Sequence, residues 1–266
     1  MHGKKKSGNT KATMAHIKVK TQKEIELIRS AGALAAETLI RAGEMCKPGV
    51  STLEIDEFIG NFTKKNGGIS ACMGYHGYPR YACISLNEVI CHGIPDAQTI
   101  LKDGDILNID ITTILSGYHG DTSAMFLVGN VKPEVKELVA TAKLCMEEGI
   151  KAAGLPGARF SDIGNAIQPI ADEHGFSVVE DYCGHGIGRG FHEEPTVLHF
   201  ANNEHTPLIE VGNVFTIEPM INMGKPGTRT LKDGWTAVSC DGSLSAQWEH
   251  TMVRTKSGID ILTLPR

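Results

Sequence analysis

The chain has 266 residues, of which 41% are hydrophobic and 21% charged, and its formal net charge is −5. This length accommodates one large domain or two small ones, and the negative charge gives no reason to expect nucleic acid as the main partner. No apolar run reaches the roughly 18 residues that span a membrane. The seven cysteines are scattered and form no C-x-x-C pair, which favours reduced thiols in the cytoplasm over a disulfide framework or a zinc finger.

The first 16 residues, MHGKKKSGNTKATMAH, differ in composition from the rest. They contain four lysines, and no acidic residue occurs before Glu24. We interpret residues 1–16 as a disordered basic arm or a remnant of cloning, with a ribosome- or RNA-contacting tail and a transit peptide as the alternatives. The folded part is expected to begin near Ile17 and to form one catalytic domain over residues 17–266.

Two halves of the sequence resemble each other at a constant offset of 108 residues. KPGVSTLEID, with Pro48, corresponds to LPGARFSDIG, with Pro156; GDILNID, ending at Asp110, corresponds to GNVFTIE, ending at Glu218. Upstream of these segments, EIELIRSAGALAAETLI and VKELVATAKLCMEEGI both have the apolar spacing of amphipathic helices. We infer a duplicated helix-plus-strand unit with pseudo-two-fold symmetry, in which a site between the halves receives an acidic residue from each.

The segment DILNIDITTILSGYHGDTSAMFLV predicts two strands around a turn near Ser116-Gly117. A hairpin centred near Leu115-Ser116 places Asp110 and Asp121 directly opposite each other. Like charges in that position destabilise a sheet, and the β-branched neighbours of Asp110 indicate a partly buried setting. The two carboxyl groups therefore bind a cation, share a proton as an acid dyad, or point into water on an exposed face.

Further acidic residues lie in apolar surroundings in the second half. Glu218, in VFTIEPMI, and Glu249, in SLSAQWEHTMV, interrupt strand-like runs where an unpaired charge is unfavourable. The glycines of CGHGIGRGFHEEP (183–195) match neither a dinucleotide fingerprint nor a P-loop, and they let another group approach His185 closely. Four carboxylates and one imidazole exceed the ligand set of one tetrahedral zinc. They suit a pair of divalent ions, and the oxygen-rich set favours manganese, iron(II), cobalt or zinc.

Several of these motifs together resemble the type I methionine aminopeptidases: NIDITT…HGDTS, CGHGIGRGFHEEP, FTIEPM and SAQWEHT, extended by YHGYP…ISLNEVICHGIP. The resemblance runs from about residue 17 to the C-terminus. It implies an α/β (α+β) pita-bread fold, in which two pseudo-two-fold related halves with antiparallel strands and flanking helices surround a dinuclear metal site. It also implies a cytoplasmic, metal-dependent exopeptidase that removes the initiator methionine from nascent chains when the second residue is small. We expect a monomer with no membrane or specific nucleic-acid partner and at most transient contact with the ribosome.

By the same resemblance, five residues bind two divalent metal ions: Asp110, Asp121, His185, Glu218 and Glu249. Asp121 and Glu249 would bridge both ions; Asp110 would bind one ion, and His185 with Glu218 the other. Glu218 would also be the general base for a water that the ions activate and that attacks the first peptide carbonyl.

The resemblance assigns substrate contacts to His92, in CHGIP, and His192, in GFHEEP. His92 is expected near the scissile bond, and His192 at the amide that follows it. Taken singly, either histidine is more often structural, and the other histidines receive no role, although His119 and His250 stand beside predicted ligands. The methionine side chain needs an apolar, polarizable pocket, for which motif matching indicates Cys72, Tyr75, Tyr78, Cys83, Phe191 and Trp235.

Four other interpretations are weighed against this one. A prolyl-specific peptidase of the same fold typically has a large additional N-terminal domain, and creatinase-like enzymes lack this metal set. A type II aminopeptidase would have a helical insertion in the second half, where only a short gap separates His192 from Glu218. A non-catalytic binding module would not need the complete set of acidic residues.

Overall fold

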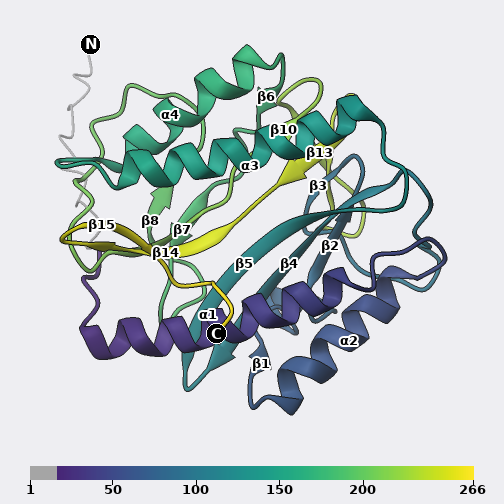
Figure 1. Ribbon diagram of the computed structural model, residues 1–266, viewed down its shortest axis with the longest axis horizontal. Helices are drawn as coiled ribbons and strands as arrows, with labels where there is room; N and C mark the ends of the chain where they lie inside the picture. Colours follow the sequence, from purple (N-terminus) through teal and green to yellow (C-terminus); the bar gives the residue numbers. More distant parts are fainter. Residues whose placement is uncertain (1–16) are drawn as a thin grey trace, which may run out of the picture.

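The computed structural model describes residues 17–266, so the interpretation of residues 1–16 lies outside the described part. Two pairs of helices flank the strands: α1 (Gln22–Gly43) with α2 (Thr52–Lys65), and α3 (Pro133–Ala153) with α4 (Phe160–Glu173). In Figure 1 one pair lies below the strands and the other above, while the long strands cross the space between them. Every strand pairing in residues 17–266 is antiparallel. The layered, two-sided arrangement agrees with the predicted fold class.

Short polar segments determine where the helices of the first half begin. The hydroxyl of Thr21 accepts the Glu24 amide at 3.3 Å, and the Glu24 carboxylate accepts the Thr21 amide at 2.9 Å. Ser51 and Glu54 repeat this reciprocal capping box at the start of α2. These bonds satisfy amides that the first helical turn leaves without partners, so each sequence fixes the residue at which its helix begins.

The strands form four sheets. In the first half, β4 (Ile106–Leu115) pairs with β1 (Ile69–Ser70), β2 (Cys83–Leu86) and β5 (Tyr118–Leu127). The largest sheet of the second half has the order β15 (Gly258–Ile261), β14 (His250–Thr255), β9 (Val214–Ile217), β7 (Gly184–Gly186), β8 (Glu193–Val197). Two three-stranded sheets complete the set, in the orders β13 (Ser245–Gln247), β10 (Met220–Asn222), β6 (Ser177–Val178) and β11 (Thr228–Thr230), β12 (Ala237–Ser239), β3 (Val89–Cys91).

The duplication inferred from sequence is confirmed by the element bounds. Helices α2 and α4 both have 14 residues and begin at positions 52 and 160, an offset of 108. Strands β1 and β6 begin at 69 and 177, and β4 and β9 begin at 106 and 214, again 108 apart. The halves meet where the Ser123 amide donates to the Glu249 carbonyl at 3.3 Å and the Glu249 amide returns a bond to Ser123 at 3.1 Å.

The predicted register of the acidic hairpin is wrong by one pair. Asp110 lies opposite Ser123, and Asp121 lies opposite Thr112. The turn lies at Ser116 (φ 53°) and Gly117 (φ 77°), as predicted, and positive φ at both is the signature of a type I′ turn. The predicted pairing was wrong because it took the hairpin centre one residue earlier, at Leu115-Ser116. A two-residue change of partner keeps side chains on the same face. Asp110 and Asp121 are therefore diagonal neighbours on one face of the sheet.

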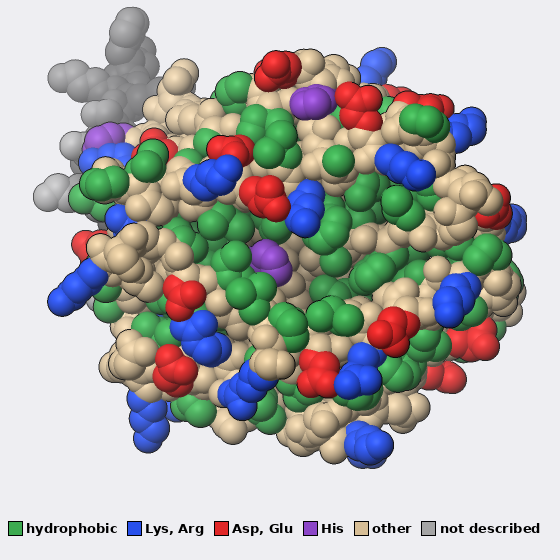
Figure 2. All heavy atoms as spheres, viewed as in Figure 1, with side chains coloured by type: hydrophobic (Ala, Val, Ile, Leu, Met, Phe, Trp, Pro, Cys, Tyr) green, Lys and Arg blue, Asp and Glu red, His purple; other side chains and the backbone are tan. Residues whose placement is uncertain are grey.

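Each half has its own hydrophobic core. Leu39 of α1 and Ile59 of α2 pack with Ile109 of β4, whereas Leu138 of α3 packs with Phe215 of β9. On the face shown in Figure 2, the Lys and Arg side chains of the described residues are interspersed with Asp and Glu around apolar side chains. Within residues 17–266, no helix combines the length and apolar character that crossing a membrane requires.

Candidate active site

A cavity of about 260 Å³ receives side chains from both halves of the chain. All the residues that the sequence singled out line it: Cys72, Tyr75, Tyr78, Cys83, His92, Asp110, Asp121, His185, Phe191, His192, Glu218, Trp235 and Glu249. The structure thus brings together segments that are up to 177 residues apart in the chain (72 to 249).

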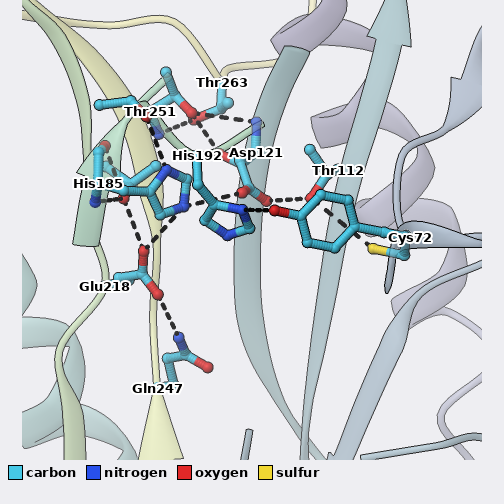
Figure 3. A network of polar contacts seen from close by, with 12 residues as sticks. Cys72, Thr112, Asp121, His185, His192, Glu218, Gln247, Thr251 and Thr263 are labelled. Atoms are coloured by element: carbon cyan, nitrogen blue, oxygen red, sulfur yellow. Dashed lines mark hydrogen bonds and ion pairs between the residues drawn. The ribbon is translucent and has the colours of Figure 1, made fainter. Parts of the chain in front are cut away.

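Charged and imidazole groups converge at one end of this cavity. Atoms of Asp121, His185 and Glu249 that can bind a metal all lie within 4.8 Å of one another. His185 Nε2 lies 3.7 Å from Asp121 Oδ2 and 3.6 Å from Glu218 Oε1. Figure 3 shows the side chains of Asp121 and Glu218 turned toward His185 from two sides. The four residues come from β5, β7, the end of β9 and the start of β14, so both halves contribute.

Neighbouring hydroxyl and amide groups orient these side chains. Thr112 Oγ1 donates to Asp121 Oδ1 at 2.8 Å, and Thr216 Oγ1 donates to Glu218 Oε1 at 2.7 Å. His185 Nδ1 lies 3.0 Å from the Gly186 carbonyl oxygen. A carbonyl can only accept, so Nδ1 bears the proton and the lone pair of Nε2 faces the two carboxylates.

Burial changes the proton affinity of every group in the cluster. It raises the pKa of Asp110 to about 7 and that of Glu218 to about 8. Burial and then the charges of neighbouring carboxylates raise the pKa values of Asp121 and Glu249 well above their ordinary range. Burial lowers the pKa of His185 to about 3, so its imidazole is neutral and able to bind a metal at neutral pH.

These groups fit a divalent cation. Glu249 Oε1 is buried and has no hydrogen-bond partner in the described residues, although a carboxylate oxygen in such a place ordinarily needs one. Several buried carboxylates without a compensating charge are unfavourable, and a bound cation supplies that charge. The oxygen-rich donor set with one imidazole is of the kind that manganese, iron, cobalt or zinc accepts.

Another part of the cavity wall is aromatic and sulfur-rich. Cys72, Tyr78 and Cys83 form a buried cluster against which Phe191 and Trp235 pack. The Phe191 ring lies 4.9 Å from that of Tyr75, and the Trp235 ring lies 5.1 Å from that of Tyr78. The Tyr78 hydroxyl is bonded to main-chain carbonyls at 2.9 and 3.1 Å, which leaves its ring as the surface it presents.

Two further histidines, His92 and His192, also line the cavity. The His192 ring centroid is 4.2 Å from that of His185, and its Nδ1 lies 2.7 Å from the Tyr75 hydroxyl. Figure 3 shows His192 beside His185. The His92 ring lies edge-on to Tyr182, with centroids 5.5 Å apart.

The sequence interpretation missed several residues of this site. Asp181, Tyr182, Cys183 and Met220 also line the cavity. Cys183 and Met220 lie within motifs already quoted and the other two directly precede one, so proximity in sequence could have indicated them. Buried His199 accepts the Glu218 amide on Nε2 at 3.1 Å. No pattern around His199 distinguishes it from an ordinary core residue.

Comparison with known proteins agrees with the geometry. Residues 26–256 match the sequence profile of metallopeptidase family M24. The chain is 52% identical over 254 residues to the methionine aminopeptidase of Escherichia coli (strain K12), which covers 93% of this chain and 94% of that protein. The crystal structure of methionine aminopeptidase from Rickettsia prowazekii superposes with a TM-score of 0.91 and 46% identity, covering 94% of this chain and 100% of the other.

A prolidase from Pyrococcus furiosus has the same fold at a TM-score of 0.72. It is only 22% identical, and the aligned part covers 93% of this chain and 66% of the prolidase, so this likeness shows the fold alone. The high identity to the aminopeptidases over nearly their full length confirms the resemblance noted in the sequence. The chain therefore belongs to metallopeptidase family M24 and, within it, to the methionine aminopeptidases.

Proposed function

We propose that this chain hydrolyses the first peptide bond of polypeptides that begin with methionine followed by a small residue, using two divalent cations. The observation that carries the proposal is that four carboxylates and one neutral imidazole line the same cavity as a cluster of aromatic and sulfur-containing side chains, with metal-binding atoms of Asp121, His185 and Glu249 within 4.8 Å of one another. The charged groups suit the metals and the reacting bond, and the apolar cluster suits a thioether side chain.

Asp110, Asp121, His185, Glu218 and Glu249 would hold the cations, with Asp121 and Glu249 shared between them. Metal-binding atoms of Asp121 and Glu249 lie within 4.8 Å of one another, which supports their sharing the ions. Bound cations of manganese, iron(II), cobalt or zinc supply Lewis acidity and a water acidified to near neutral pH.

The protein groups around that bond have separate tasks. Glu218 would accept a proton from the attacking water and pass it to the leaving amine. Thr216 and Gln247 hydrogen-bond its two carboxylate oxygens. If the Tyr75 hydroxyl donates to His192 Nδ1, then His192 bears its proton on Nε2. In that tautomer it can donate to the carbonyl or amide of the substrate, and His92 faces the scissile bond from another wall.

The methionine side chain would lie against Tyr75, Phe191 and Trp235, above the thiols of Cys72 and Cys83. Polarizable sulfur and aromatic edges are favourable neighbours for a thioether. A restricted space beyond the scissile bond would exclude large second residues.

We assign this activity to nascent chains in the cytoplasm, with the enzyme as a monomer and with no more than transient contact with the ribosome. The support is that all seven cysteines are unpaired, which is typical of proteins in a reducing compartment.

Two ligand variants test the proposal. Asp110→Ala and Glu249→Ala should each lose bound metal, measured by elemental analysis after dialysis, and should no longer release methionine from Met-Ala-Ser. Glu180→Ala, which removes an exposed carboxylate that does not line the cavity, is the matched control and should keep both properties. Full activity in Asp110→Ala and Glu249→Ala would refute the assigned site.

A further inference from the structure

Lys20, near the first of the described residues, restrains the loop that brings Phe191 and His192 to the cavity. Lys20 precedes the Thr21 cap of α1, and its amide donates to the Gly212 carbonyl at 2.8 Å. Val19 forms an isolated β-bridge with Asn213. The Lys20 main chain is therefore fixed on both sides.

The Lys20 side chain forms a buried ion pair with Glu193. Its Nζ donates to Glu193 Oε2, and the two side chains are only 6% and 12% exposed. The path is narrow: a Cβ on Gly188 would lie 2.6 Å from Lys20 Nζ, so a larger residue at position 188 would displace the ammonium group. Such enclosure keeps water from competing for the charges, in contrast to a surface ion pair.

Glu193 connects this lysine to the loop. Its second oxygen, Oε1, accepts the Gly190 amide at 2.8 Å. Burial opposes ionisation of Glu193, but the hydrogen bonds from Lys20 and from the Gly190 amide outweigh it and lower the pKa of the carboxyl group. One carboxylate thus ties the Lys20 ammonium to the residue immediately before Phe191.

The other side of the loop is held by the acidic hairpin. The His119 amide donates to the Gly188 carbonyl at 2.8 Å, and the His119 ring stacks on Phe191 with centroids 5.7 Å apart. Phe191 and His192 therefore lie between two points of restraint, one at Gly188, made by His119, and one at Glu193, made by Lys20. Only the restraint by Lys20 depends on charge.

We propose that Lys20 is a positioning residue for substrate recognition: through Glu193 and the Gly190 amide it sets the placement of Phe191 and His192 against the methionine side chain. This inference rests on the proposed function for its kinetic consequence, whereas the restraint of the loop is a property of the protein alone. Removal of the ammonium group leaves a buried carboxylate without its partner, which favours a shift of the loop toward water.

The kinetic test compares Lys20→Met with Lys23→Met, which removes an exposed lysine three residues away. In Lys20→Met the KM for Met-Ala-Ser should rise about tenfold, because misplaced binding groups weaken recognition. The ratio of kcat/KM for Met-Ala-Ser over Leu-Ala-Ser should fall about fivefold, since pocket shape separates the two side chains. Metal content should be unchanged. A merely destabilising substitution lowers the active fraction and leaves that ratio as it was.

A double variant adds an internal check. In Lys20→Met/Glu193→Gln the unpaired charge is gone, while the side-chain amide oxygen introduced at position 193 can still accept the Gly190 amide. The Met/Leu ratio of kcat/KM should therefore recover partly, and the losses from the two single substitutions should not add. Additive losses would contradict the proposed connection. If Lys20→Met does not fold, Lys20→Gln carries the same comparison.

Hydrogen exchange of the Gly190 amide distinguishes failure of this inference from failure of the proposed function. Exchange should be faster in Lys20→Met than in the wild type or Lys23→Met, whether or not any of them cleaves peptides. Faster exchange in a protein that releases no methionine would retain the loop restraint and reject the proposed function. Unchanged exchange, or an unchanged Met/Leu ratio in active protein, would overturn the positioning role.

Discussion

The Tyr75 hydroxyl lies 2.7 Å from His192 Nδ1 and joins a residue of the first half to the loop of the second. Burial raises the pKa of Tyr75, so its hydroxyl keeps a proton that it can donate to Nδ1. Such a bond selects the His192 tautomer with its proton on Nε2, directed away from Tyr75.

Tyr75→Phe keeps the aromatic ring and removes only this bond. We expect kcat/KM for Met-Ala-Ser to fall about tenfold, the equivalent of roughly 1.4 kcal/mol for one hydrogen bond. His192→Ala should cause a larger loss with metal content preserved, and adding Tyr75→Phe to it should cost little more. An equal tenfold loss in the His192→Ala background would show that Tyr75 acts independently of His192.

Glu218→Gln separates the proposed base from the proposed ligand. The amide keeps the size of the side chain and one oxygen donor, but it cannot accept a proton, so kcat should fall by about a hundredfold or more. Metal stoichiometry and kcat are measured on the same preparation. If kcat remained at the wild-type level with both metals bound, Glu218 would not be the base.

Asp56, which does not line the cavity, tests the electrostatic account of stability. Its Oδ1 accepts the Tyr81 and Ala82 amides, each at 2.9 Å, and burial raises its pKa to about 6. The stabilising effect of its protonated form is fully present below its unfolded pKa near 3.8 and is lost as the pH rises through 6.

Asp56→Asn keeps an oxygen for both amides and cannot ionise. The unfolding free energy of the variant minus that of the wild type should therefore increase by about 2 kcal/mol as the pH rises from 4 to 7. Urea unfolding at several pH values measures this difference. A difference that stays constant with pH would contradict the raised pKa.

The close approach of another main-chain segment explains why the residue after His185 is a glycine, Gly186. A Cβ at position 186 would lie 2.1 Å from the Glu194 carbonyl oxygen, which is main chain and has little freedom to move. Gly186→Ala should lower the unfolding free energy by about 1–3 kcal/mol and weaken metal binding by displacing His185. Gly154→Ala, at a helix end with φ −79°, is the control and should change little. Normal metal affinity in a folded Gly186→Ala protein would show that this close approach is unimportant for the site.

Much of the fold and of the cavity could be predicted because the signals are local or repeated. The 108-residue offset predicted paired elements, and the bounds of α2 and α4 preserve it. Hydrophobic runs interrupted by Asp110, Glu218 and Glu249 indicated buried acidic groups, which the structure places around one cavity.

The parts that could not be predicted depend on tertiary contacts or on fine register. The turn near Ser116-Gly117 was predicted correctly, but the pairing register failed because the hairpin was centred at Leu115-Ser116, one residue too early, an error that periodicity alone does not expose. The ion pair between Lys20 and Glu193 joins residues 173 positions apart, and no local sequence pattern predicts it. The same holds for His199 beneath Glu218.

The most direct test of the central claim uses protein stripped of metal and then titrated with manganese or cobalt, while release of methionine from Met-Ala-Ser is followed. We predict no release before metal is added, increasing release up to two equivalents of metal, and none from Met-Lys-Ser or N-acetyl-Met-Ala-Ser. Release that is unaffected by stripping, or its absence with manganese, iron(II), cobalt and zinc alike, would contradict the claim that these residues form a metal-dependent methionine aminopeptidase site.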